Sequence, residues 1–278
     1  MPVRTRRTGI RLTLGLASAT FCAAWPLAAQ EPGTGRDGPV WTLEGLRSGQ
    51  CVRFLMDPAA ARKQVRPGTR LIRADQDQTL HLVLRSVISE QTNFAPWTPA
   101  SLCLFYSDAI RLGGRRLGSK DARKKQMLGV WTVAASEEGG ARRDIVLDLF
   151  GASAELVRAA ERGGVKVREA GSAVSKAPAT GNDLYDVRVG KTRLIWNGRA
   201  AGDTTPVGQP LEHLWLTRGA SGTFWRVKAT FRPAWTRSLV GVLTVEGKDD
   251  LAKALKASPT RFVGPLYLGG EGELRFSR

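Results

Sequence analysis

The chain has 278 residues and a formal net charge of +17 at pH 7, because 42 lysines and arginines outnumber 25 aspartates and glutamates. This length is enough for one large domain or two small ones with a real hydrophobic core. No stretch after the N-terminal segment reaches the about 20 apolar residues of a membrane-spanning helix, so we expect no transmembrane segment in the mature chain. A strongly basic chain attracts polyanions such as lipopolysaccharide, acidic polysaccharide or nucleic acid.

The N-terminus has the three-part layout of a secretory signal peptide. Four arginines without an acidic residue lead into an apolar or small run at residues 12–24, and small residues end at Ala29. We therefore predict a signal peptide at residues 1–29 and a mature protein in the periplasm or outside the cell. A retained membrane anchor is the alternative, which the shortness of the apolar run disfavours. The pair Arg6-Arg7 resembles the twin-arginine export pattern and leaves that route open.

Signal cleavage changes the cysteine count from odd to even. It removes Cys22 and leaves Cys51 and Cys103, while the loss of four arginines lowers the net charge from +17 to +13. An even count in an oxidising compartment favours a disulfide bond, here closing a loop of about 50 residues worth 4 kcal/mol in the chain-entropy model. Two buried free thiols are the alternative. The two cysteines and the distant His81 and His213 lack zinc-ligand spacing, so no metal site is predicted.

After a flexible Gly- and Pro-rich leader at residues 30–40, short β-branched or aromatic runs bounded by turn residues dominate the chain. These runs predict strands at residues 51–56, 101–107, 128–135, 144–150, 165–169, 184–189, 192–196, 211–217, 223–231, 238–246, 260–268 and 273–277. Residues 189–192 predict a tight hairpin with glycine at the first central position. Polar and apolar residues alternate along residues 224–231, as in an antiparallel sheet with one solvated side.

Three short helices interrupt the strands. Residues 77–91 carry an apolar stripe with helical spacing, and Asp77 is one candidate for the N-terminal cap. A second helix is predicted at residues 154–162, with Ser153 as its N-cap and two glycines as its stop. A third is predicted at residues 249–257, with its apolar residues on one side.

These elements predict an α+β protein dominated by antiparallel strands, either a two-sheet sandwich or two similar β-rich subdomains. Two segments, residues 146–167 and 242–263, both have the pattern strand, glycine turn, short helix and strand. The likeness suggests an internal duplication, although two common patterns can also coincide. We expect a β-rich first half at residues 41–170, a linker at residues 171–183, and a β-rich second half at residues 184–278. The linker segment could equally be one long surface loop.

The basic segment at residues 111–125 is the sharpest functional feature, because only Asp121 opposes its positive charges. Charge-assisted hydrogen bonds from such a cluster would hold phosphates or sulfates, and a solvated loop is the alternative. The segment imitates a phosphate-binding loop near Ser119, but its serine and lysine stand in the reverse order. The candidate anionic-ligand site comprises Arg111, Arg115, Arg116, Lys120, Arg123, Lys124 and Lys125.

Tryptophan is the second feature. Trp rings on a sheet face stack on sugars, and they also fill the cores of β proteins. Trp196 lies at the end of a predicted strand, where a site could open, and Trp215 lies in the next predicted strand. These two residues are the candidate aromatic ligand contacts.

Recognisable catalytic motifs are mostly missing. The sequence has no Gly-x-Ser-x-Gly segment, and neither histidine carries a supporting signature. We therefore expect no cofactor and lean against an enzyme. We predict a non-catalytic binding or interaction module of the bacterial envelope or secreted fraction, with an anionic polymer or another envelope protein as partner and nucleic acid less favoured. The alternative is a polysaccharide-active or cell-wall hydrolase that uses a pair of carboxylates.

Overall fold

The computed structural model describes residues 38–117, 126–136, 142–176, 183–219 and 221–278. Within these ranges strands dominate and four α-helices accompany them, so the β-rich α+β prediction is confirmed in its coarse form. The sandwich is not confirmed. The sheet is mixed and not purely antiparallel, because β6 (Arg142–Gly151) pairs in parallel with β7 (Arg168–Lys176) and with β10 (Leu211–Arg218).

Four strands form a wall that has a core on each face. They are β1 (Val40–Met56), β3 (Thr98–Leu112), β5 (Gln126–Ser136) and β6, paired in this order. Every β5 residue before Ser136 is buried. A strand covered on both faces has a nearly continuous apolar sequence, which explains the unbroken run at residues 128–135. The register of β1 against β3 places Cys51 opposite Cys103, and the two form a disulfide bond.

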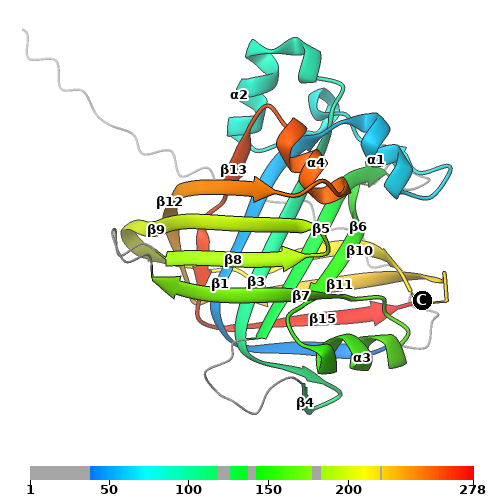
Figure 1. Cartoon of the computed structure of the whole chain (residues 1–278), viewed down its shortest axis with the longest axis vertical. Coiled ribbons are helices and arrows are strands. Elements are labelled where there is room, and N and C mark those ends of the chain that lie inside the picture. The colour runs from blue at the N-terminus through cyan, green and yellow to red at the C-terminus, as the bar shows by residue number, and fades with distance from the viewer. Residues whose placement is uncertain (1–37, 118–125, 137–141, 177–182, 220) are drawn as a thin grey trace, which may run out of the picture. The chain divides into compact units, whose positions relative to one another are not determined.

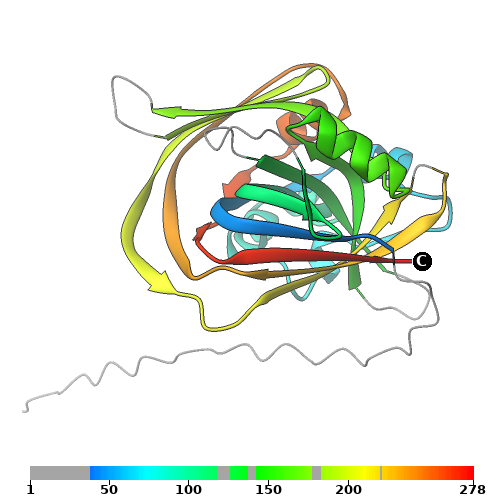
Figure 2. The ribbon, with the colours of Figure 1, turned by 90° about the horizontal axis from the view of Figure 1, so that it is seen from below.

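The sheet closes into two rings of neighbouring strands that share this wall. The first ring continues from β1 through β14 (Leu266–Leu268), β12 (Trp235–Glu246), β9 (Thr192–Pro206), β8 (Asp183–Val189) and β7 to β6. Figure 2 shows β9 and β12 curving away from the wall. The first core fills this ring, and α1 (Pro58–Gln64) and α4 (Asp250–Ala257) contribute Ala61, Leu251 and Leu255 to it (Figure 1).

The second ring runs from β1 through β15 (Glu271–Ser277), β11 (Phe224–Arg232) and β10 to β6. The second core fills it, and there Phe105 stacks on Phe231 with ring centroids 4.2 Å apart. Helix α3 (Ala154–Arg162) packs Leu156 and Ala160 against this core. The short strands β2 (Arg70–Leu71), β4 (Arg115–Leu117) and β13 (Arg261–Val263) extend the wall by pairing with β5, β3 and β1.

Side-chain caps explain where three helices begin. Ser153 accepts a hydrogen bond from the Leu156 N–H at the start of α3, and Asp249 accepts one from the Ala252 N–H at the start of α4. Helix α1 was not among the predicted helices, although its signals are present. It follows Asp57, whose carboxylate accepts two backbone N–H bonds, and proline occupies its first turn.

Helix α2 (Leu82–Glu90) is shorter than the predicted helix at residues 77–91. The His81 imidazole caps it by accepting from the Val83 N–H at 3.2 Å. Asp77 lies after the 3-10 helix η1 (Ala74–Gln76) and accepts from the N–H and hydroxyl of Thr79 instead. Helix α2, η1 and η2 (Thr92–Phe94) surround a small third cluster on Leu55 of β1.

The predicted strand segments each overlap a strand, but several boundaries differ. Strand β1 begins at Val40, eleven residues before the predicted strand at 51–56. Of the predicted linker, residues 171–176 belong to β7 and residue 183 to β8, while residues 177–182 lie outside the described ranges. The division into two halves and the duplication stay predictions. The predicted signal peptide also lies outside those ranges, and none of the helices in the described ranges is both long and apolar enough to cross a bilayer.

Candidate functional site

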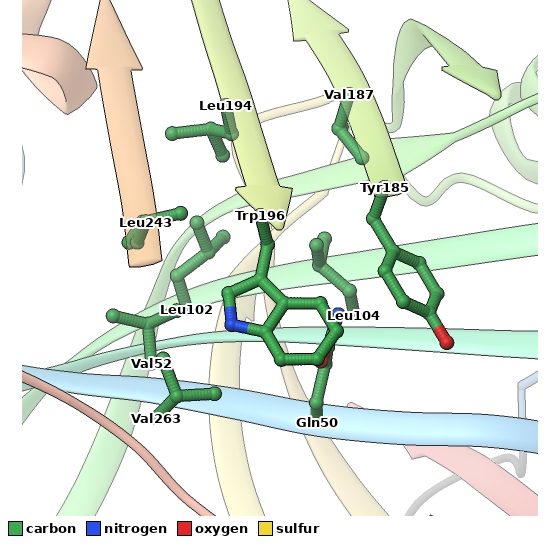
Figure 3. Close-up of a pocket in the computed structure, with 10 residues that line it drawn as sticks. All are labelled: Gln50, Val52, Leu102, Leu104, Tyr185, Val187, Leu194, Trp196, Leu243 and Val263. Carbon is green, nitrogen blue, oxygen red and sulfur yellow. The ribbon is translucent and has the colours of Figure 1, made fainter. Parts of the chain in front are cut away.

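A cavity lies inside the first ring, between the shared wall and the strands that curve away from it. Its lining residues are Gln50, Val52, Leu102, Leu104, Tyr185, Val187, Leu194, Trp196, Leu243 and Val263 (Figure 3). The empty space among these side chains has a volume of about 340 Å³ when the part that opens to solvent is included. The centre of a water molecule fits within only about 20 Å³ of this space. That room suffices for about one water molecule, so a larger guest requires lining side chains to turn aside.

Strand alternation and register bring these side chains together. Successive residues of a strand point to opposite faces, so Gln50 and Val52 of β1 both face the first ring. Within the wall, Gln50 of β1 pairs with Leu104 of the adjacent strand β3. On the other side of the cavity, Tyr185 of β8 pairs with Trp196 of β9. The lining therefore combines residues more than 200 positions apart, from Gln50 to Val263.

Two polar atoms in this lining have no protein partner. Gln50 is 3% exposed and Trp196 is 4% exposed, and within the described residues neither Gln50 Oε1 nor Trp196 Nε1 makes a hydrogen bond. A buried polar atom left unpaired costs about 1–3 kcal/mol. Five further buried polar atoms of the described residues are also unpaired, but none belongs to a residue that lines the cavity. The cavity thus offers one acceptor and one donor to a guest.

Aromatic side chains surround the polar end of the cavity. The rings of Tyr185 and Trp196 lie 5.2 Å apart between centroids, and those of Tyr106 and Tyr185 lie 5.4 Å apart. Burial raises the pKa of the Tyr106 phenol well above its ordinary value, and the Ser172 hydroxyl donates to its oxygen at 3.3 Å. Tyr106 therefore stays protonated at neutral pH.

The ten lining residues include no lysine, arginine, histidine, cysteine or carboxylate. A Schiff base would need a desolvated lysine, and metal binding would need a cluster of ligands. The His, Cys, Asp and Glu residues of the described ranges form no group of three that could hold a metal ion. In this arrangement the lining supplies apolar contact and hydrogen bonds. An anionic guest would lose its hydration without a counter-charge, so the lining favours a neutral molecule.

The acidic residues do not converge on this cavity. Asp186 of β8 binds Arg193, with 2.8 Å between Oδ2 and Nη2, and this hydrogen-bonded cation lowers the pKa of Asp186. Burial raises the pKa of Asp148, whose carboxylate is paired with Arg168. A shallow surface pocket at the β8–β9 turn also has paired charges, because Arg193 reaches Glu246 at 3.5 Å.

The described part of the predicted anionic-ligand site lies on the β3–β4 hairpin, outside the cavity. Arg111 binds Glu44 at 2.5 Å, Arg115 lies 3.6 Å from Glu155, and Arg116 donates to the Asp108 carbonyl at 3.2 Å. These three guanidinium groups therefore already have partners in the protein. The other four predicted residues, Lys120, Arg123, Lys124 and Lys125, lie outside the described ranges.

The two tryptophans predicted as aromatic contacts lie in different cores. Trp196 borders the cavity in the first core, whereas Trp215 is 4% exposed in the second core. Sequence reasoning missed Gln50 and Tyr185. The available signal for Gln50 was an amide directly before an apolar run, at a position that strand alternation places on the same face as Val52.

No family model matches this chain, and no curated protein matches it either. Among solved structures it is similar to an acetoacetate decarboxylase from Legionella pneumophila, with 12% identity, 92% of each chain covered and a TM-score of 0.49. An acetoacetate decarboxylase-like enzyme from Sphingomonas wittichii has 11% identity over 86% of this chain and 90% of that chain, with a TM-score of 0.45. The enduracididine biosynthesis enzyme MppR, complexed with pyruvate, has 12% identity over 88% and 89%, with a TM-score of 0.44.

These matches contradict the predicted function. The structures that resemble the chain are enzymes, so the prediction of a non-catalytic envelope module that contacts an anionic polymer or another envelope protein is wrong. The alternative of a polysaccharide or cell-wall hydrolase stays a prediction, and the carboxylates of Asp148, Asp186 and Glu246 are each paired with an arginine. At identities of 11–12% and TM-scores below 0.5, the matches assign neither a substrate nor a catalytic residue to this chain.

Proposed function

We propose that the protein takes up a small, neutral, largely apolar molecule with a hydroxyl or amide headgroup inside the first ring. The observation that carries this proposal is the pair of unpartnered polar atoms, Gln50 Oε1 and Trp196 Nε1, in an otherwise apolar cavity. A hydroxyl or a primary amide both donates and accepts, so one such headgroup could satisfy both atoms.

The rest of the lining supports an apolar body for the guest. Nine of the ten lining residues are aliphatic or aromatic, namely Val52, Leu102, Leu104, Tyr185, Val187, Leu194, Trp196, Leu243 and Val263. Ligand sites of this kind bind through apolar contact and use a few polar groups to orient the ligand. Because about 20 Å³ is open, we expect the half-buried Leu243 on β12 to move when a guest enters.

Calorimetric titration of the full chain with n-hexanol, hexanamide and hexanoate at pH 8 tests the proposal. We expect saturable binding of the alcohol and the amide, and at least tenfold weaker binding of hexanoate, because no cation in the lining replaces the hydration of its carboxylate.

Trp196→Phe removes the indole N–H and keeps an aromatic ring, so it should weaken hexanamide binding about tenfold, the value of one hydrogen bond. Trp225→Phe is the matched control, because Trp225 is also buried with an unpaired Nε1 but belongs to the second core. Equal loss in both variants would contradict the proposal. A crystal structure soaked in hexanamide that shows only a water molecule between Gln50 and Trp196 would do the same.

A further inference from the structure

A second set of polar side chains lies on the other face of the shared wall, the face that carries the second core. Arg53 of β1 pairs with Ser101 of β3, and Ser101 pairs with Thr132 of β5. Strand alternation places Arg53 on the face opposite Val52 and Phe54, which belong to the first core. The hydroxyl oxygens of Ser101 and Thr132 lie 2.8 Å apart, and a guanidinium therefore stands beside two hydroxyl groups.

His213 lies two residues before Trp215 of the second core, so strand alternation places both side chains on the same face. It belongs to β10, whose register with β6 places the neighbouring Trp215 beside Asp144. The imidazole stacks on Trp215 with 5.9 Å between centroids and meets the edge of Phe231 at 6.4 Å. Burial lowers the pKa of His213, an effect that Asp144 opposes and Arg53 strengthens. The imidazole is therefore neutral at pH 7.

Arg53 differs from the other cation of this region in its partners. Arg142 lies 3.2 Å from Asp77 and 3.1 Å from Asp144, so two carboxylates neutralise it. Within the described residues the Arg53 guanidinium makes no hydrogen bond and has no carboxylate within ion-pair distance, although the residue is half-buried. Burial lowers the pKa of His81 at the start of α2, and the charge of Arg53 lowers it further. A half-buried guanidinium with five donors and no acceptor is a ready partner for a planar oxyanion.

Solvent reaches this region, which a binding site needs. The side chain of Arg142 is 35% exposed and that of Asp144 is 21% exposed, whereas the second core beyond them is closed by Trp215 and Phe231. Asp144 and Asp77 keep the region from being uniformly positive, so a multiply charged polymer is disfavoured there. A small molecule with one negative group fits this balance of charge.

We propose that a small organic acid binds here with its carboxylate on the Arg53 guanidinium, and that Ser101, Thr132 and His213 contact its polar substituents. This site is separate from the cavity of the first ring and takes the opposite class of ligand. The planar fork of arginine matches a carboxylate with two parallel hydrogen bonds, which a lysine cannot reproduce.

The histidines provide a direct readout, because the chain has only two of them. Proton NMR of the full chain should show both imidazole signals moving on titration with butyrate or pyruvate, with His81→Gln supplying the assignment. The pKa of His213 should rise when the carboxylate binds, because an added negative charge favours the imidazolium. Inorganic phosphate is the comparison anion.

Arg53→Gln should weaken carboxylate binding at least tenfold, and Arg53→Lys should give an intermediate loss. Arg199→Gln is the matched control, because Arg199 is an exposed arginine on β9 and its loss changes the net charge equally. Circular dichroism checks that each variant is folded. Saturation by phosphate and not by the carboxylates, equal affinity in Arg53→Gln and wild type, or carboxylate binding that leaves both histidine signals unmoved would each overturn the proposal.

Discussion

Removal of the disulfide bond between Cys51 and Cys103 should lower the free energy of unfolding by about 4 kcal/mol. The two cysteines are separated by 52 positions and lie directly opposite each other on β1 and β3 of the shared wall. In the chain-entropy model, freeing a loop of this length returns about 14 cal/mol/K to the unfolded chain, which is about 4 kcal/mol at 25 °C. The native strands keep their ladder of hydrogen bonds, so the effect should reside mainly in the unfolded state.

Guanidinium chloride unfolding of the oxidised protein and of the double variant Cys51→Ala/Cys103→Ala measures this difference. The double substitution leaves no unpaired thiol, and reduced wild-type protein is the control that keeps both sulfur atoms. We expect the midpoint to fall and the slope m to rise, because the unfolded chain becomes more expanded and exposes more surface. A loss below about 1 kcal/mol with an unchanged slope would refute the reasoning from unfolded-state entropy.

Three further predictions concern the two cores and their charges. Arg168→Met should lower the free energy of unfolding by up to about 3 kcal/mol at neutral pH, because it leaves the Asp148 carboxylate buried without its cation. Burial holds the pKa of Asp148 above its unfolded value, so the variant should lose stability as the pH rises from 4 to 7. A loss of stability that grows towards pH 4 would contradict this. In the folded protein the pKa of His213 lies below its ordinary value of 6.5, so the folded state binds fewer protons than the unfolded state. The free energy of unfolding should therefore fall as the pH drops below about 6.5. In urea unfolding measured from pH 7 to 5, His213→Gln should reduce this dependence of stability on pH. Gly129→Ala would place a Cβ 2.5 Å from Phe150 Cδ2 in the shared wall and should cost about 1–3 kcal/mol, whereas Gly208→Ala meets no atom within 4 Å and should leave the melting temperature unchanged.

Local patterns in the sequence predicted much of the secondary structure. The caps at Ser153 and Asp249 mark the starts of α3 and α4, because a side-chain oxygen that accepts a free N–H is a local interaction. The predicted strand segments also overlap strands of the structure, because the side-chain pattern of a strand is likewise local. Helix α2 is the clearest error in a boundary, since the predicted helix covers residues 77–91 and the helix of the structure begins only at Leu82.

The candidate site was predicted only in part. Trp196 was named from its position at a strand end, but Gln50 was not. The two residues line the same cavity only because of strand pairings that no local pattern encodes. Likewise Arg53 carries no sequence signature, and it becomes notable only because the register sets it beside Ser101 on the face of the wall that carries the second core. The predicted basic cluster is the opposite case, because its charge pattern is visible in the sequence but the partners of its residues are not. Arg111 and Arg115 form ion pairs with residues on other elements.

The sequence by itself determined the β-rich composition, the principal strand and helix positions, and the cysteine pair that could bond, because these follow from side-chain periodicity and local hydrogen bonding. The signal peptide and the export of the chain stay predictions. Only the tertiary structure decided that the sheet closes into two rings with a shared wall. Ring closure depends on pairings between strands far apart in the chain, such as β1 with β15 and β6 with β10, whose free energy arises from many distant contacts together. The two interiors that carry the proposed sites exist only after that closure.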